Sequence, residues 1–279
     1  MPERRQREQR SPGDFAPILS GEDPPLIVGG QAVNIWAELY ARKLPALGIF
    51  APFTSADADI YGSRALAETL ARRAGWEYHA VQEKDSVAVA ILTKTSPVGQ
   101  APLTIEVLRE VNGLTAVDLN LNTMVELGPG ERYRIPPPLV LLKAKLYNLV
   151  SLANLNRPQD LKHTRMLMQI VPQRFNELLA EQRRGKVTME NLVGSIHYAG
   201  QVVHAGASGN AAISHHLDFR QLIPVSLVHG PTALQAALQG FFDGLPDFPS
   251  TGGREFPEGL SVKTTPPTRR AKTSRRIRP

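Results

Sequence analysis

The sequence of 279 residues contains no cysteine. A chain without thiols cannot form a disulfide framework, a zinc–thiolate site or a cysteine nucleophile, and its composition suits a reducing cytoplasm. Long apolar runs are also missing. The longest, Leu139–Leu142, is soon followed by Lys143 and Lys145, so no segment predicts a membrane-spanning helix. Since the charged start Met1–Arg10 leads into no hydrophobic signal core, we expect a cytoplasmic protein that does not bind membranes.

Acidic residues are missing from residue 263 onward, a stretch that carries a charge of +7, whereas the whole chain carries +6. The remainder is therefore close to neutral. A basic tail suits contact with nucleic acid, and it equally suits a solubilising, disordered end. We expect residues 246–279 to form such a disordered basic tail. From Lys263 onward its basic side chains are Lys263, Arg269, Arg270, Lys272, Arg275, Arg276 and Arg278.

The order of the expected elements predicts an α+β fold. Residues 1–20 are charged and contain proline, so we expect a flexible leader there. Residues 21–136 alternate strand and helix patterns and predict a mixed-sheet domain, and residues 137–245 are helical in pattern and predict a second domain. The triple proline Pro136–Pro138 marks the boundary. The expected helices of the second half are Leu139–Asn154, Asp160–Arg183, Met189–Val203 and Thr232–Phe242.

The first half begins with a strand, a glycine turn and a helix. Leu26–Val28 is a short apolar run that ends at Gly29-Gly30, and apolar residues recur at helical spacing over Gln31–Arg42. A second strand is expected over Ala56–Tyr61, followed by a helix over Arg64–Arg73 with Ser63 as its N-cap and Gly75 after its end. Further strands are expected at Glu77–Val81, Val87–Leu92, Leu103–Leu108, Thr123–Leu127 and Tyr133–Ile135. The last two bracket Gly128-Pro129-Gly130, which predicts a hairpin turn.

Three acidic residues stand out within the expected strands. Asp57 and Asp59 alternate with alanine, so their carboxylates would share one face of a strand, about 6–7 Å apart. Two like charges at that distance repel unless cations lie between them, and carboxylate oxygens suit Mg²⁺. Glu106 lies in an otherwise apolar strand, where a buried acid is costly unless it is paired or binds metal. The three residues therefore predict a magnesium site.

The glycine turn predicts a phosphate site near the same place. Gly29 and Gly30 end a strand just before a helix, which exposes backbone N–H groups and a helix N-terminus to an anion. Glycines let phosphate approach the backbone closely. Thr54 and Ser55 would add hydroxyl donors beside the phosphate.

These motifs resemble those of the polymerase-beta-type nucleotidyltransferase superfamily, and within it the AbiEii-like nucleotidyltransferases of bacterial abortive-infection and toxin–antitoxin systems. The resemblance rests on Val28-Gly29-Gly30, on Ser55-Ala56-Asp57-Ala58-Asp59-Ile60, and on the isolated acid Glu106. In the helical half, Leu141–Lys145 and Arg157–Asp160 resemble that group's lysine helix and downstream aspartate. The likeness covers roughly residues 25 to 185.

The resemblance implies a role for each matching residue. Asp57, Asp59 and Glu106 would bind Mg²⁺, with two ions expected, and Glu106 would also help to activate the acceptor hydroxyl. Gly29 and Gly30 would hold phosphates of a nucleoside triphosphate. The nucleotide or acceptor side would be lined by Lys143, Lys145 and Asp160. The implied partners are the triphosphate, an RNA, protein or small-molecule acceptor, and an antitoxin protein.

Other interpretations of the same residues stay open. Lys143 and Lys145 cannot both face one way on a helix, and both suit a solvent-exposed face. Asp160 can simply favour a helix N-terminus. The spacing between Gly30 and Asp57 is longer than usual for the superfamily, and glutamate replaces the commoner aspartate at position 106. The chain is therefore also compatible with a non-catalytic binding protein of this fold, or with a nucleic-acid binder that acts through its basic tail.

Overall fold

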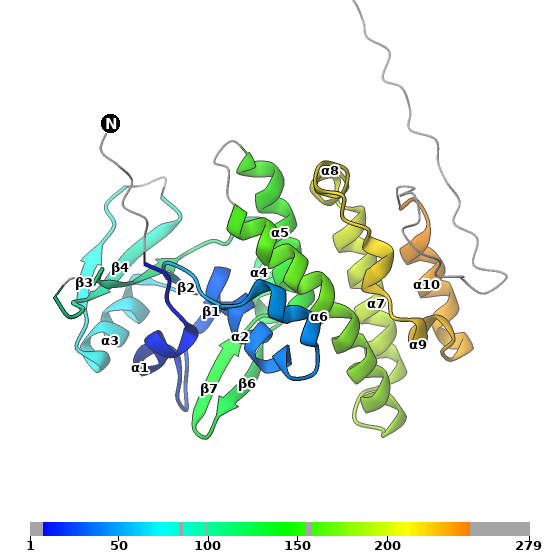
Figure 1. Ribbon diagram of the computed structural model, residues 1–279, viewed down its shortest axis with the longest axis horizontal. Helices are drawn as coiled ribbons and strands as arrows, with labels where there is room; N and C mark the ends of the chain where they lie inside the picture. Colours follow the sequence, from blue (N-terminus) through cyan, green and yellow to red (C-terminus); the bar gives the residue numbers. More distant parts are fainter. Residues whose placement is uncertain (1–7, 84–85, 99, 154–157, 246–279) are drawn as a thin grey trace, which may run out of the picture.

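The computed structural model describes residues 8–83, 86–98, 100–153 and 158–245 (Figure 1). These residues form an α+β structure in which a mixed seven-stranded sheet with its helices is followed by a helical region. The predicted basic tail, residues 246–279, lies outside the described residues. The strands are β1 (Leu26–Val28), β2 (Ala58–Tyr61), β3 (Glu77–Ala80), β4 (Ala88–Lys94), β5 (Leu103–Leu108), β6 (Thr123–Gly128) and β7 (Glu131–Ile135).

The strand order of the sheet is β3-β4-β5-β2-β1-β7-β6. Two neighbouring pairs, β2 with β5 and β1 with β7, are parallel, and the other pairs are antiparallel. The predicted hairpin around Gly130 is confirmed as β6–β7. Its strand β6 ends the sheet on one side, whereas β1, β2 and β5 occupy the middle.

Ten α-helices are described. They are α1 (Ala16–Leu19), α2 (Gly29–Ala41), α3 (Arg64–Ala74), α4 (Ala116–Asn120), α5 (Pro138–Ser151), α6 (Pro158–Arg183), α7 (Met189–His204), α8 (Gly206–His215), α9 (Val225–Val228) and α10 (Gln235–Phe242). The predicted ends of α3 are confirmed: the Ser63 side chain accepts a hydrogen bond from the Leu66 N–H, and Gly75 adopts a left-handed conformation with φ 68°. No helix of the described ranges is long and apolar enough to cross a membrane.

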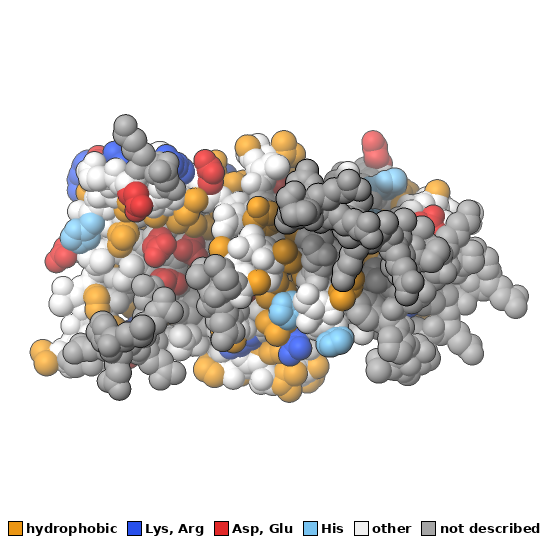
Figure 2. All heavy atoms as spheres, turned by 90° about the horizontal axis from the view of Figure 1, so that it is seen from above, with side chains coloured by type: hydrophobic (Ala, Val, Ile, Leu, Met, Phe, Trp, Pro, Cys, Tyr) orange, Lys and Arg blue, Asp and Glu red, His pale blue; other side chains and the backbone are white. Residues whose placement is uncertain are grey.

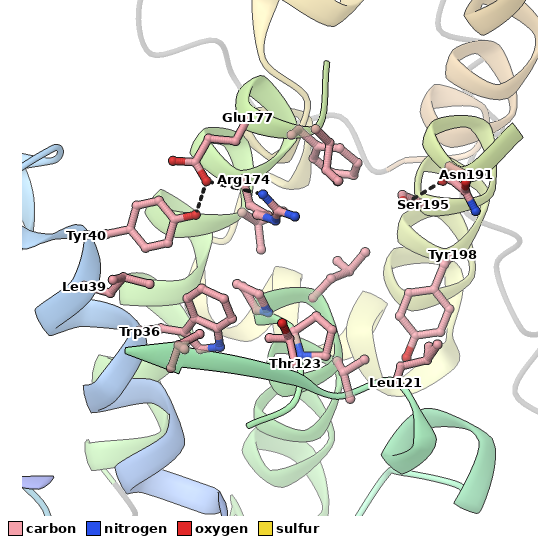
Figure 3. A pocket seen from close by; sticks show the side chains of 18 of the residues that line it. Trp36, Leu39, Tyr40, Leu121, Thr123, Arg174, Glu177, Asn191, Ser195 and Tyr198 are labelled. Atoms are coloured by element: carbon pink, nitrogen blue, oxygen red, sulfur yellow. Dashed lines mark hydrogen bonds and ion pairs between the residues drawn. The ribbon is translucent and has the colours of Figure 1, made fainter. Parts of the chain in front are cut away.

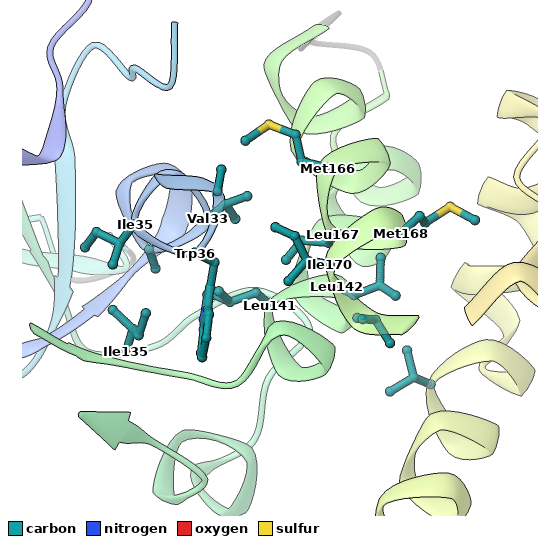
Figure 4. Close-up of a cluster of buried hydrophobic side chains, with 14 of the residues drawn as sticks. Val33, Ile35, Trp36, Ile135, Leu141, Leu142, Met166, Leu167, Met168 and Ile170 are labelled. Atoms are coloured by element: carbon teal, nitrogen blue, oxygen red, sulfur yellow. The ribbon is translucent and has the colours of Figure 1, made fainter. Parts of the chain in front are cut away.

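One face of the sheet packs into the main hydrophobic core. Ala58 and Ile60 of β2 and Ile105 and Val107 of β5 are fully buried, because alternate residues of each strand point to this face. Helices α2, α5 and α6 meet next to the sheet, where apolar side chains from all three interdigitate (Figure 4). The same cluster of buried side chains continues into the helical region as far as Leu245, so the two halves share one core.

The opposite face of the sheet carries a smaller apolar cluster. Leu26 and Val28 of β1 pack there with Leu119 of α4, and Tyr61 and Leu108 lie against them. Because this cluster occupies only part of the face, the middle of the sheet keeps room for the polar residues Asp59 and Glu106, which are partly exposed. The second face therefore combines an apolar support with an accessible acidic region.

The prediction of a flexible leader over residues 1–20 is wrong for residues 8–20. Arg10 forms a β-bridge with Ser55, Pro12–Phe15 form a short 3-10 helix, and α1 follows. The side chains of Phe15, Ile18 and Leu19 are fully buried in the main core. Burial of three large apolar side chains outweighs the charge and proline content of this segment.

Candidate functional site

The candidate site begins with two carboxylates on adjacent strands. Asp59 of β2 and Glu106 of β5 are register partners in a parallel pair, and so are their buried neighbours Ile60 and Val107. Side chains at matched positions of adjacent strands point to the same face of a sheet. Since Ile60 and Val107 point into the core, Asp59 and Glu106 lie together on the other face. Glu106 is partly exposed, so the prediction of a buried acid at this position is wrong.

The glycine turn lies directly against Asp59. Val28 is the register partner of Asp59 on β1, and Gly29 follows it as the first residue of α2. Gly29 has φ 64°, a conformation that L side chains rarely adopt. A Cβ on Gly29 would lie 1.9 Å from Oδ2 of Asp59. Only glycine therefore fits between the start of α2 and the carboxylate.

We predict that Gly29→Ala destabilises the protein more than Gly75→Ala does. Gly75 has a similar φ of 68°, but a Cβ added there would meet no atom within 4 Å, so this variant isolates the backbone strain of about 1–2 kcal/mol. Gly29→Ala adds displacement of Asp59, at a further cost of ~1–3 kcal/mol. Urea unfolding of both variants measures the difference. Equal losses of stability in the two variants would show that the Asp59 side chain makes room for a Cβ on Gly29 without cost.

Asp57 differs from its predicted position. The strand expected over Ala56–Tyr61 begins only at Ala58, so Asp57 lies in a bend immediately before β2. The alternation that would align Asp57 with Asp59 therefore does not extend to Asp57. Within the four described ranges, no three His, Asp or Glu side chains are grouped so that they could hold a metal ion by themselves. The structure thus brings together two of the three predicted carboxylates through strand register.

The second glycine faces a buried polar cluster. A Cβ on Gly30 would lie 2.4 Å from Oγ of Ser55, which is 5% exposed. Asn34 of α2 donates a hydrogen bond from Nδ2 to this Oγ at 3.1 Å, and also to Oε1 of Gln31 at 3.2 Å. Gln31 in turn donates to the backbone carbonyl of Arg10 at 3.0 Å. Because the Ser55 oxygen accepts from Asn34, the Ser55 hydroxyl hydrogen is left to donate elsewhere.

Sequence reasoning missed His163, which completes this cluster. His163 of α6 is fully buried, and its Cε1 would lie 3.0 Å from a Cβ on Gly30. Nε2 of Gln159 donates to the Thr54 carbonyl at 2.8 Å and lies 3.1 Å from Nε2 of His163. A carbonyl only accepts, so the Gln159 nitrogen is a donor and Nε2 of His163 accepts from it. The spacing Gln159 to His163, one helical turn, was the only sequence signal for this contact.

Lys145 and Asp160 form a buried ion pair. The Lys145 ammonium of α5 lies 2.7 Å from Oδ1 of Asp160, in the first turn of α6, and the two side chains are 6% and 2% exposed. The solvent-exposed interpretation of Lys145 is therefore wrong. The pair connects the two helices of the lysine–aspartate motif, and Asp160 lies on the same helix as His163, which adjoins Gly30.

Lys143 points to a different partner, as expected for a residue two positions from Lys145. Its ammonium lies 2.7 Å from Oδ2 of Asp118 in α4, and the Tyr198 hydroxyl donates to Oδ1 of the same carboxylate at 2.5 Å. Burial raises the pKa of Asp118, but hydrogen bonds from Lys143, Tyr198 and Thr115 outweigh burial and lower the pKa to about 2. Lys143 thus connects α5 with α4 and α7, and its ion-pair partner is Asp118 rather than a carboxylate of the candidate site.

The donor set fits a magnesium ion that a substrate helps to bind. Mg²⁺ usually uses one or two carboxylates and completes its shell with water and substrate phosphates. Asp59 and Glu106 supply two carboxylates. Gly29, the first residue of α2, lies directly against Asp59, and a helix N-terminus is a favourable place for phosphate. Figure 2 shows acidic side chains gathered over the sheet-containing half, on the left of that view.

Comparisons with known protein families and with curated proteins found no match to this chain. The fold and the arrangement of these side chains therefore carry the functional argument.

Proposed function

We propose that this protein is a magnesium-dependent nucleotidyltransferase. The observation that carries the proposal is the register of Asp59 with Glu106, together with the contact between Asp59 and the start of α2 at Gly29. Two carboxylates on one face of a sheet, next to a glycine turn that opens a helix, suit a metal-bound triphosphate. The resemblance of the glycine, Asp-x-Asp and strand-glutamate motifs to the polymerase-beta-type superfamily supports the same activity.

In this proposal the first turn of α2 binds the phosphates. Backbone N–H groups at Gly29 and Gly30 and the Ser55 hydroxyl donate to phosphate oxygens, and the helix N-terminus favours their negative charge. Asp59 and Glu106 would hold Mg²⁺, and the bound ion would supply positive charge against the charge that develops on the transferring phosphate. Asp57, one residue before β2, is close enough in sequence to add a ligand once the triphosphate is bound.

The reaction is transfer of a nucleoside monophosphate. An acceptor hydroxyl forms a bond to the α-phosphorus, the bond from that phosphorus to the bridging oxygen breaks, and pyrophosphate leaves. Glu106 takes the proton of the acceptor hydroxyl, directly or through water. Positioning by Gly29, Gly30 and Ser55 supplies most of the remaining catalytic effect.

The acceptor is a tRNA end, a protein side chain or a small molecule, and the resemblance to AbiEii-like proteins favours a toxin that acts within a toxin–antitoxin or phage-defence system. Such a toxin acts in the cytoplasm and is opposed by an antitoxin. The chain without its basic end is close to neutral, which favours a local contact with RNA over a large one.

The proposal is tested by following two labels of the same nucleotide. The purified protein is incubated with Mg²⁺, total RNA and cell extract, and with each nucleoside triphosphate labelled on either the α- or the γ-phosphate. Nucleotidyl transfer places the α-label on the acceptor and the γ-label in pyrophosphate. Transfer of the γ-label to the acceptor would indicate phosphoryl transfer instead. Triphosphate binding without transfer of either label would indicate a non-catalytic binding protein of this fold.

A further inference from the structure

A cavity of about 820 Å³ lies away from the candidate catalytic site. Helices α2, α6 and α7, the start of α5 and the edge strand β6 surround it, and none of Asp57, Asp59, Glu106, Gly29 or Gly30 lines it. Figure 3 shows Trp36 and Tyr40 on one side and Tyr198 on the opposite side, with Arg174 and Glu177 toward the top of the view. Its size and its aromatic and aliphatic lining are typical of a binding site.

The cavity follows the edge of β6 rather than one face of the sheet. Thr123, Met124, Val125 and Glu126 all line it, although successive side chains of a strand point to opposite faces. Residues whose side chains point to opposite faces can border one cavity where that cavity reaches the edge of the strand. Strand β6 is the last of the sheet and, in the described part of the chain, pairs only with β7. The N–H and C=O groups of β6 that do not bond β7 therefore point to the open edge, which this cavity borders.

Exposed apolar side chains flank this edge. Leu121, just before β6, is 45% exposed, and Met124 within β6 is 46% exposed, whereas Val125 next to Met124 is buried. Edge strands are normally protected by charged residues or covered by another element. An exposed leucine and methionine beside open backbone groups and a preformed apolar cavity are instead typical of a surface that receives an added strand.

The charges around the cavity favour a basic occupant. Glu177 accepts a hydrogen bond from the Tyr40 hydroxyl at 2.6 Å and pairs with Lys43 at 2.7 Å, and Arg174 pairs with Glu181 at 2.8 Å. The cations Lys43 and Arg174 are therefore already neutralised. Glu126 and Glu190 also line the cavity, are exposed, and take part in no ion pair of the described residues. The two exposed acids leave a local excess of negative charge next to the open edge.

We propose that β6 and this cavity bind an extended segment of a partner protein by β-strand addition. The segment pairs with the outer edge of β6, places apolar side chains at alternate positions into the cavity, and carries Lys or Arg next to them, facing Glu126 and Glu190. An added strand satisfies the open backbone groups, which a small molecule does not. This surface is separate from the proposed catalytic site, so strand addition does not depend on nucleotide transfer.

A random eight-residue peptide library, selected on the full chain, tests the proposal. Selected peptides are expected to alternate apolar and polar residues and to contain Lys or Arg at an end. Met124→Arg places a charge at the open edge and is expected to weaken their binding at least about tenfold, or ~1.4 kcal/mol. Ile213→Arg on α8, where Ile213 is 64% exposed, is the matched control and leaves binding unchanged.

Backbone methylation of the best peptide separates strand addition from simple apolar binding. Methylating the N–H groups of one alternate set blocks pairing with β6, whereas methylating the other set leaves binding intact. Three results would overturn the proposal. They are a library that yields no binder, equal binding to the Met124→Arg chain, and tolerance of both methylated sets. Self-association of the chain alone that Met124→Arg abolishes would assign the edge to a second copy and also contradict it.

Discussion

Replacing Asp59 with asparagine is expected to lower nucleotidyl transfer by on the order of 10³-fold, about 4 kcal/mol of transition-state stabilisation. Asparagine keeps the size of the side chain next to Gly29 but removes the charge that holds the cation. Asp59 is central to the site because it is the register partner of both Val28 and Glu106. The measurement is the rate of α-label transfer under single-turnover conditions, with unfolding midpoints to verify the fold.

Asp23→Asn is the matched control for this loss, because Asp23 is exposed and precedes β1. It removes the same charge from the same half of the protein, so it is expected to transfer label at the wild-type rate. If Asp59→Asn and Asp23→Asn are equally active, Asp59 has no role in metal binding. A fall in activity that follows a lower unfolding midpoint would assign Asp59 a structural role.

Lys145→Met is expected to lower the free energy of unfolding by about 3–5 kcal/mol, because it leaves the Asp160 carboxylate buried without its cation. For a folded body of this size the loss corresponds to roughly 6–20 °C in melting temperature. The two side chains are 6% and 2% exposed, so water cannot replace the missing ammonium group. Calorimetry at neutral pH measures the effect.

Two further variants separate the contribution of the ion pair to the free energy of unfolding from the effect of losing the lysine side chain itself. Lys145→Met combined with Asp160→Asn removes both charges and is expected to recover about 1–3 kcal/mol relative to Lys145→Met alone. Lys186→Met changes an exposed lysine after α6 and is expected to change stability by less than about 0.5 kcal/mol. A double variant no more stable than the single one would mean that packing, not charge, determines the cost.

Local features of the fold could be predicted from the sequence because neighbouring residues determine them. The strand Leu26–Val28, the Ser63 cap of α3 and the β6–β7 hairpin all depend on residues a few positions apart. The strand order of the sheet does not depend on neighbouring residues, so the sequence did not predict it. The parallel pairing of β2 with β5 joins segments more than 40 residues apart, and nothing in either strand specifies its neighbour.

The sequence predictions that the structure contradicts were wrong for physical reasons. The charges of the leader hide Phe15, Ile18 and Leu19, whose spacing is that of one apolar helix face. The sequence suits a Lys145 that reaches a ligand or solvent, whereas Lys145 binds Asp160, because pairing of buried charges depends on how two helices pack. The cavity beside β6 is lined by five separate segments, so no local motif could have indicated it.

Binding of Mn²⁺ in place of Mg²⁺ tests the central claim most directly. Free Mn²⁺ is followed by electron paramagnetic resonance during titration of the full chain, in the presence of a triphosphate whose α,β-bridge is non-hydrolysable. We predict that wild type and the controls Asp23→Asn and Glu110→Gln bind Mn²⁺ with the nucleotide, since Glu110 is exposed just after β5. Asp59→Asn and Glu106→Gln are each expected to lose at least about tenfold in affinity. Equal Mn²⁺ binding by all five proteins would contradict it.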